Sequence, residues 1–154
     1  MSDYENPWIF EGKSFTSDLI GDNFGFVYCI TNLVNKRKYL GRKYFWSFRK
    51  PKGKSRKVKS ESDWKKYYGS CPELKEDVNH FGKQKFSREI LSLHSTKGKV
   101  NFEETRQLFL NNVLTESLTE GIPAYYNSNI LGRYYRKDYF ESPTENCEVD
   151  VELN

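Results

Sequence analysis

The stretch "GFVYCITNLVNKRKYLGRKYF" occupies residues 25–45 and predicts two neighbouring strands joined by a turn. From Gly25 to Thr31, larger apolar or aromatic side chains occupy every second position, which is the period of a β-strand. "NLVNKR" supplies the turn residues, and "KYLG" is the returning strand. The hairpin therefore brings Tyr28 and Tyr39 close together, beside a run of cations.

Basic residues continue directly after this hairpin. Between Lys36 and Lys66 there are 14 Lys or Arg against two acids, so the stretch has a net charge of +12, while the whole chain has +4. A concentrated cationic patch is typical of a protein that binds a polyanion. A solvated, flexible loop is the alternative interpretation of such a run.

Further along the chain, the pattern predicts one more strand. Pro51 and Gly53 indicate a loop over residues 49–62, preceded by a short helix or turn at 43–50. "KFSREILSL", residues 85–93, is a plausible third strand.

Two helices are expected. Over residues 71–82, Pro72 suits the first helical turn and Gly82 the C-terminal cap, with an apolar stripe between them. Residues 101–117 form the second, for which Asn101 can serve as the N-terminal cap.

The length of 154 residues favours one domain, and 16% aromatic residues are too many for a disordered chain. We expect an N-terminal extension over 1–22 that packs on a body at 23–140, followed by an acidic, loosely held tail at 141–154. The fold class predicted for the body is α+β, with a small antiparallel sheet of three strands flanked by helices.

Some classes of protein are disfavoured. There is no apolar run of about 18 residues and no signal-peptide pattern at the start, so we expect a soluble, cytoplasmic protein without a membrane partner. Cys29, Cys71 and Cys147 are odd in number and widely spaced, which predicts neither a disulfide framework nor a zinc site.

The tripeptides "FVY" at 26–28 and "YLG" at 39–41 resemble the two signature tripeptides of the GIY-YIG nuclease superfamily, although Phe and Val replace the first Gly and Ile. Later features follow in the family's order: Arg49 eight residues after Gly41, then "NHFGKQKFSREIL", "NFEETRQLF" and "YYN". The resemblance spans about residues 25–130. "YYGS" is similar to the form found in phage-borne members, for which the host bacterial cytoplasm is the expected location.

The resemblance implies a metal-dependent DNA endonuclease that hydrolyses phosphodiester bonds with Mg²⁺ or Mn²⁺; homing-type and nicking cleavage both remain open. It implies that Glu104 binds the metal and that Arg49, on a helix, stabilises the phosphate charge. Tyr28 is favoured as the base, with Tyr39 orienting the water and Asn127 supporting the site by hydrogen bonds. DNA binding is predicted for seven cations: Arg42, Lys43, Lys50, Lys52, Lys54, Arg56 and Lys57.

Each assignment has a structural rival. Tyr28 and Tyr39 are also what a pair of cross-strand core aromatics would look like. Glu104 stands three residues after Asn101, where a capping-box Glu belongs, and Glu103 competes with it as the metal ligand.

Alternatives also remain for the other site residues and for the whole chain. Arg49 could be one more member of the basic loop, and Asn127 could fix a turn, with Asn129 as its competitor. A noncatalytic nucleic-acid binding module on the same scaffold is the leading alternative function, and a protein that binds an acidic partner is the third. Sequence specificity would come from the loop at 50–62, the N-terminal extension or a homodimer.

Overall fold

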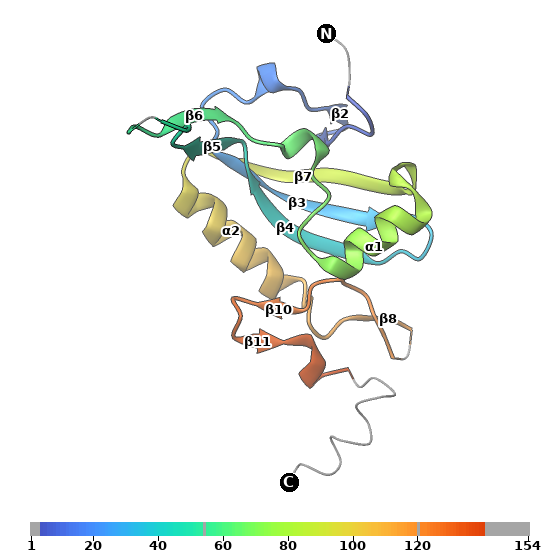
Figure 1. The fold of residues 1–154 in the computed structure, drawn as a ribbon. Coiled ribbons are helices and arrows are strands. Elements are labelled where there is room, and N and C mark those ends of the chain that lie inside the picture. The colour runs from blue at the N-terminus through green and yellow to red at the C-terminus, as the bar shows by residue number, and fades with distance from the viewer. Residues whose placement is uncertain (1–3, 54, 120, 141–154) are drawn as a thin grey trace.

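The structure is a computed structural model that describes residues 4–53, 55–119 and 121–140. At its centre is the expected hairpin: β3 (Gly25–Asn32) pairs antiparallel with β4 (Lys38–Tyr44), and Tyr28 lies opposite Gly41. The third expected strand, β7 (Phe86–His94), pairs antiparallel with β3 on its other side (Figure 1).

The sheet has five strands rather than three. The N-terminal segment adds β1 (Ile9–Phe10) and β2 (Lys13–Ser14), which gives the order β2-β1-β7-β3-β4. Because Ile9 pairs parallel with Glu89 of β7, the sheet is mixed. Strands of two residues are too short to show an alternating pattern, which is why the sequence did not predict them.

One face of the sheet packs against the N-terminal segment and helix α1 (Pro72–Phe81). The helix lies within its predicted range, and Gly82 at its C-terminal cap has a φ of 95°, which favours glycine. This core gathers large side chains from distant segments, among them Trp8, Phe26, Tyr28, Ile30, Trp64 and Leu74. Tyr28 is therefore a core aromatic, as its structural rival interpretation required.

The other face packs against α2 (Lys97–Leu110), whose bounds differ from the prediction. Thr96 is the N-terminal cap and accepts a hydrogen bond from the backbone N–H of Lys99 at 3.1 Å, so Asn101 lies inside the helix. The helix ends at Leu110, and Asn112 adopts a φ of 51°, which interrupts the helical backbone well before residue 117.

A second hairpin replaces the predicted helix or turn at 43–50 and part of the loop at 49–62. It consists of β5 (Trp46–Arg49) and β6 (Val58–Glu61), with Phe48 opposite Lys59. The four residues of β6 are all exposed and have no apolar alternation. In β5, the alternation of Trp46 and Phe48 with Ser47 and Arg49 covers only four residues, which is too short to predict a strand against the surrounding run of cations.

The C-terminal segment covers the start of β4, which is the edge strand of the sheet. The backbone N–H of Lys38 donates to Ala124 and that of Tyr126 donates to Lys38, so this segment runs parallel to β4 there. The short remaining elements are β8 (Ser117–Thr119), β9 (Ile122–Pro123), β10 (Asn129–Ile130), β11 (Tyr134–Tyr135) and the 3-10 helices η1 (Ser17–Leu19), η2 (Trp64–Lys66), η3 (Lys83–Lys85) and η4 (Arg136–Asp138).

Some predictions concern parts of the chain that the structure does not describe. The acidic tail at 141–154, with Cys147, lies outside the described residues. Cys29 and Cys71 are free thiols. Within the described ranges, no helix combines the length and apolar character needed to cross a membrane.

Arg88, on β7, ties the N-terminal segment to the sheet. It is 1% exposed, and its guanidinium donates to the backbone carbonyls of Tyr67 at 2.8 Å and Asn6 at 3.2 Å. It also lies over the rings of Trp8 and Tyr68, 4.6 and 4.2 Å from their centroids. Burial lowers the pKa of Arg88, which indicates that its charge is held at a desolvation cost that these contacts offset.

We expect Arg88→Met to lower the free energy of unfolding by about 3 kcal/mol, because it leaves buried carbonyls without their donors. Urea denaturation monitored by tryptophan fluorescence measures this. Glu89→Gln, at the exposed neighbouring position, is the matched control and should change the free energy by less than about 0.5 kcal/mol. A loss below about 1 kcal/mol for Arg88→Met would contradict the role of Arg88 in tying the N-terminal segment to the sheet.

Candidate active site

Side chains from both faces of the sheet meet at the exposed edge of β4. Tyr39 packs with the core that contains α1, whereas Leu40 packs with the core under α2. Successive residues of a strand point to opposite faces. Lys43 therefore lies on the same face of β4 as Tyr39, and Arg42 lies on the same face as Leu40. The edge therefore offers a phenol, an ammonium and a guanidinium within a few residues.

A cavity of about 420 Å³ lies between this edge, α2 and the C-terminal segment. Tyr39, Arg42, Glu104 and Asn127 line it, so residues from three segments that are far apart in the sequence share one cavity. This is the convergence that a site for one phosphate requires.

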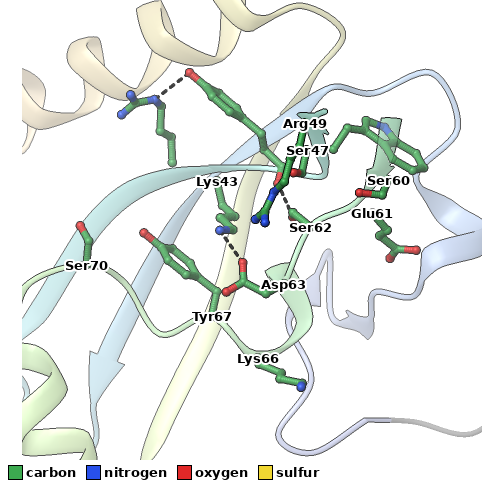
Figure 2. A pocket seen from close by; sticks show the side chains of 13 residues that line it. Lys43, Ser47, Arg49, Ser60, Glu61, Ser62, Asp63, Lys66, Tyr67 and Ser70 are labelled. Atoms are coloured by element: carbon green, nitrogen blue, oxygen red, sulfur yellow. Dashed lines mark hydrogen bonds and ion pairs between the residues drawn. The ribbon is translucent and has the colours of Figure 1, made fainter. Parts of the chain in front are cut away.

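A larger cavity of about 1000 Å³ adjoins the first, since Arg42 and Ser70 line both. Figure 2 shows it between the end of β4, the β5–β6 hairpin and the segment that contains η2. Lys43, Arg49 and Lys66 line it together with Tyr67. We call the two adjoining cavities the groove.

Glu104 is held by Arg42 in the smaller cavity. The guanidinium of Arg42 donates to the carboxylate of Glu104 at 3.1 Å and, through Nε, to the hydroxyl of Tyr44 at 3.1 Å. Tyr44 in turn donates to Asn101 on α2 at 2.8 Å. Burial raises the pKa of Glu104, and the neighbouring Arg42 opposes that rise.

The structure bears on the two alternatives to Glu104 as the metal ligand, which are a capping-box role for Glu104 and Glu103 as the ligand. Since α2 begins at Lys97, Glu104 sits well inside the helix, and a capping-box role is excluded. Glu103 forms its hydrogen bonds with Arg106 at 2.8 Å and Gln107 at 2.8 Å and does not line the groove.

Three phenols cluster beside Glu104. The Tyr28 and Tyr39 ring centroids are 6.2 Å apart, and those of Tyr28 and Tyr67 are 6.1 Å apart. Burial raises the pKa of Tyr28 well above its ordinary value, with smaller upward contributions from Tyr67 and Tyr39. Burial also raises the pKa of Tyr39, while a hydrogen bond with Ser70 opposes the rise. All of these shifts favour the neutral phenol.

Gly41 allows the two strands to carry this cluster. A Cβ atom at this position would lie 2.6 Å from the Tyr28 hydroxyl oxygen and 3.1 Å from the Tyr39 ring. Any side chain at this position would displace one of the two phenols. Sterics therefore explain why a glycine occupies the last position of "YLG".

A family model described as "Putative endonuclease segE, GIY-YIG domain" matches residues 8–130. The chain belongs to the SegE-type GIY-YIG family. The match covers most of the chain and includes the N-terminal strands and the β5–β6 hairpin. Searches of curated proteins and of solved structures found no significant match.

In this SegE-type chain, Arg49 does not lie on a helix as expected. It lies at the end of β5 and lines the larger cavity, whereas Arg42 is the guanidinium that shares the smaller cavity with Glu104. The eight-residue spacing from Gly41 is present, but the strands β4 and β5 occupy the place where a helix was expected.

Asn127 binds the backbone of the edge strand. Its side chain accepts from the N–H of Leu40 at 3.1 Å and donates to the carbonyl of Leu40 at 2.8 Å. Leu40 stands between Tyr39 and Gly41, so Asn127 fixes the backbone that carries them. Asn129, its competitor, also lines the smaller cavity, but its side chain accepts from the backbone N–H of Gly132 at 2.9 Å in an exposed turn and does not bind the edge strand.

The cations predicted to bind DNA fall into three groups. Arg42 and Lys43 line the groove, and Lys43 is 2.7 Å from a carboxylate oxygen of Asp63. Lys50, Lys52, Arg56 and Lys57 are exposed in the loop of the β5–β6 hairpin, outside the groove lining. Lys54 lies outside the described residues.

The donors at Glu104 suit a hard divalent cation. Within the described ranges, no group of three or more His, Cys, Asp or Glu side chains is arranged to hold a metal ion. Mg²⁺ is commonly bound by one or two carboxylates together with substrate phosphate and water, so the single carboxylate of Glu104 fits it.

Sequence reasoning missed Tyr67 and Lys66. Tyr67 contacts Tyr28 and lies under the ammonium of Lys43, 4.1 Å from its ring centroid. Both missed residues belong to "DWKKYYGS", of which "YYGS" was compared with phage-borne members of the family but given no role at the site.

Proposed function

We propose that this chain is a DNA endonuclease that hydrolyses phosphodiester bonds in the groove at the edge of β4. The observation that supports this most strongly is that Tyr39, Arg42 and Glu104 line one cavity. Family membership supports the same class of reaction. DNA is the proposed substrate because two further cations, Lys43 and Lys66, line the adjoining larger cavity, where they can bind neighbouring backbone phosphates.

Phosphodiester hydrolysis needs an oriented water, stabilisation of the negative charge that develops on the phosphate, and a stabilised leaving oxygen. Arg42 has the planar, permanently charged fork that binds two phosphate oxygens at once. Tyr44 and Glu104 hold that fork at the cavity, so Arg42 is in position before the substrate arrives.

Glu104 is the proposed ligand for Mg²⁺ or Mn²⁺. A bound divalent cation supplies Lewis-acid stabilisation of the phosphate and of the leaving oxygen. The carboxylate must be ionised for this role, and the pairing with Arg42 favours the ionised form. Asn101 accepts a hydrogen bond from Tyr44, and Tyr44 accepts one from Arg42. These two bonds orient the Arg42 guanidinium, which in turn holds the carboxylate of Glu104.

The phenols are proposed to act chiefly as hydrogen-bond donors. Burial keeps the pKa of Tyr28 high, so the phenol is neutral at physiological pH. Tyr28 is 1% exposed and does not line the groove, whereas Tyr39 does. A general base must come within hydrogen-bond reach of the proton that it takes. Tyr39 is therefore the better placed phenol to contact a water or a phosphate oxygen.

We expect Tyr39→Phe to lower kcat by about 10- to 150-fold, the value of one hydrogen bond to a charged group. Tyr28→Phe should cost less, because its hydroxyl acts through Tyr67 and Tyr39. Single-turnover cleavage of a labelled duplex gives both rates, and duplex affinity should be unchanged. A larger loss for Tyr28→Phe would restore Tyr28 as the base.

Incubation with supercoiled plasmid tests the function itself. Nicked or linear product with Mg²⁺ or Mn²⁺, and none with EDTA, supports an endonuclease. DNA binding without cleavage under any divalent ion would favour a noncatalytic binding module. Failure to bind DNA at low salt would overturn both.

A further inference from the structure

The β5–β6 hairpin projects from the end of β4, on the side of the molecule far from α1 (Figure 1). Phe45 joins β4 to β5 and is fully buried, so the hairpin is anchored in the core at its base. The strands pair from Trp46 opposite Glu61 to Arg49 opposite Val58. Beyond them, residues 50–53 and 55–57 are exposed.

One face of the hairpin rests on the body of the protein. Phe48 stacks on Phe24 with ring centroids 6.5 Å apart, and Trp46 packs against the core. The carboxylate of Glu61 accepts from the indole N–H of Trp64 at 2.6 Å. These contacts fix the direction in which the hairpin projects.

The opposite face forms a wall of the groove. Ser47 and Ser60 are paired across the strands, and Arg49 follows on the same face. All three line the larger cavity, as Figure 2 shows for the labelled side chains, and at the base of the hairpin Trp46 and Glu61 line it as well. The wall thus contributes two hydroxyls and a guanidinium to the cavity that Lys43 and Lys66 also line.

Among the described residues, the cations of the loop beyond this wall have no acidic partner. None of the ion pairs among the described residues involves a residue between Arg49 and Lys59. Elsewhere in the described chain, Arg37, Arg42 and Lys43 are each within ion-pair distance of a carboxylate. Like charges gathered on one exposed loop repel one another, and a polyanion relieves that repulsion.

We propose that the β5–β6 hairpin is a DNA-binding arm that contacts backbone phosphates flanking the cleaved one. This inference rests on the proposed function, because it places the cleaved phosphate at Glu104 and Arg42. The wall of the groove guides the strand away from the smaller cavity, and the loop cations bind phosphates beyond it. Contacts to phosphates position the duplex without reading its sequence.

The test compares two variants that each remove four positive charges. The arm variant carries Lys50→Gln, Lys52→Gln, Arg56→Gln and Lys57→Gln. The control variant carries Lys13→Gln, Lys36→Gln, Lys75→Gln and Lys85→Gln, all at exposed positions outside the groove lining. Fluorescence anisotropy in EDTA gives the affinity for two unrelated duplexes over a series of salt concentrations.

Each phosphate contact contributes about 0.9 to the slope of log affinity against log salt, so the arm variant should lose up to about 3.6 from the slope. The loss should be equal on the two duplexes, and the control should keep the parent's slope. With Mg²⁺, the arm variant should raise KM while kcat at saturating duplex is unchanged.

Equal slopes for the arm and control variants would overturn the proposal while leaving the endonuclease intact. A loss confined to one duplex would also overturn it, because the arm would then read bases. If the parent itself fails to bind either duplex, the proposed function fails instead.

Discussion

Glu104→Gln is expected to abolish DNA cleavage while leaving duplex affinity within the range of the parent protein. Glutamine keeps the shape of the side chain and removes the negative charge, so the proposed metal ligand is lost from the cavity. The rate should fall by more than about 10³-fold, because Glu104 is the only carboxylate among the described residues that line the smaller cavity. Single-turnover cleavage of a labelled duplex measures the fall.

The pKa of Glu104 also gives the fold control for this variant. Because its pKa in the folded protein is raised, the neutral form is favoured there, and its contribution to stability is lost as pH rises through that pKa. At neutral pH, Glu104→Gln should therefore melt at the parent's temperature or above it. Inactivity with a lowered melting temperature would not support the assignment.

Glu103→Gln is the matched control on the same helix. Glu103 is paired with Arg106 at 2.8 Å and does not line the groove, so this variant should cleave at nearly the parent's rate. An active Glu104→Gln together with an inactive Glu103→Gln would transfer the ligand role to Glu103.

Arg42→Gln is expected to lower kcat by about 10²- to 10³-fold, the effect of removing one preorganised group that stabilises transition-state charge. Arg42→Lys should recover only part of the rate, because an ammonium lacks the planar fork. Arg106→Gln, which removes an exposed guanidinium from α2, is the control and should be nearly as active as the parent.

The acid limb of the pH–rate profile separates a direct role of Arg42 from a general loss of structure. Cleavage requires ionised Glu104, so the rate should fall as pH drops through its raised pKa. Arg42 lowers that pKa, so without Arg42 the same carboxyl stays protonated to a higher pH. The acid limb of Arg42→Gln should therefore move to higher pH, and an unmoved limb would contradict the pairing.

The central hairpin, α1 and β7 were predictable because their patterns are local. Alternation along β3 and the Pro72 and Gly82 signals at the ends of α1 depend on neighbouring residues alone. The N-terminal strands, by contrast, exist because Trp8 and Arg88 bring a distant segment against β7. Such pairing leaves no periodic signal in the segment itself.

The candidate site was predictable in part. Tyr39, Glu104 and Asn127 share a cavity, as the resemblance implied for one site, but the roles assigned to them await the experiments above. The helical placement of Arg49 was wrong, because the hairpin occupies the chain that should have formed the helix. The pairing of Arg42 with Glu104 joins two segments 62 residues apart, and no local pattern reports it.

The most direct test of the central claim is a crystal structure of the Glu104→Gln variant bound to duplex DNA with Mg²⁺. We predict a backbone phosphate in the smaller cavity, within hydrogen-bond distance of the Arg42 guanidinium and beside the Tyr39 hydroxyl. Duplex bound to another face of the molecule, with no phosphate in that cavity, would contradict it.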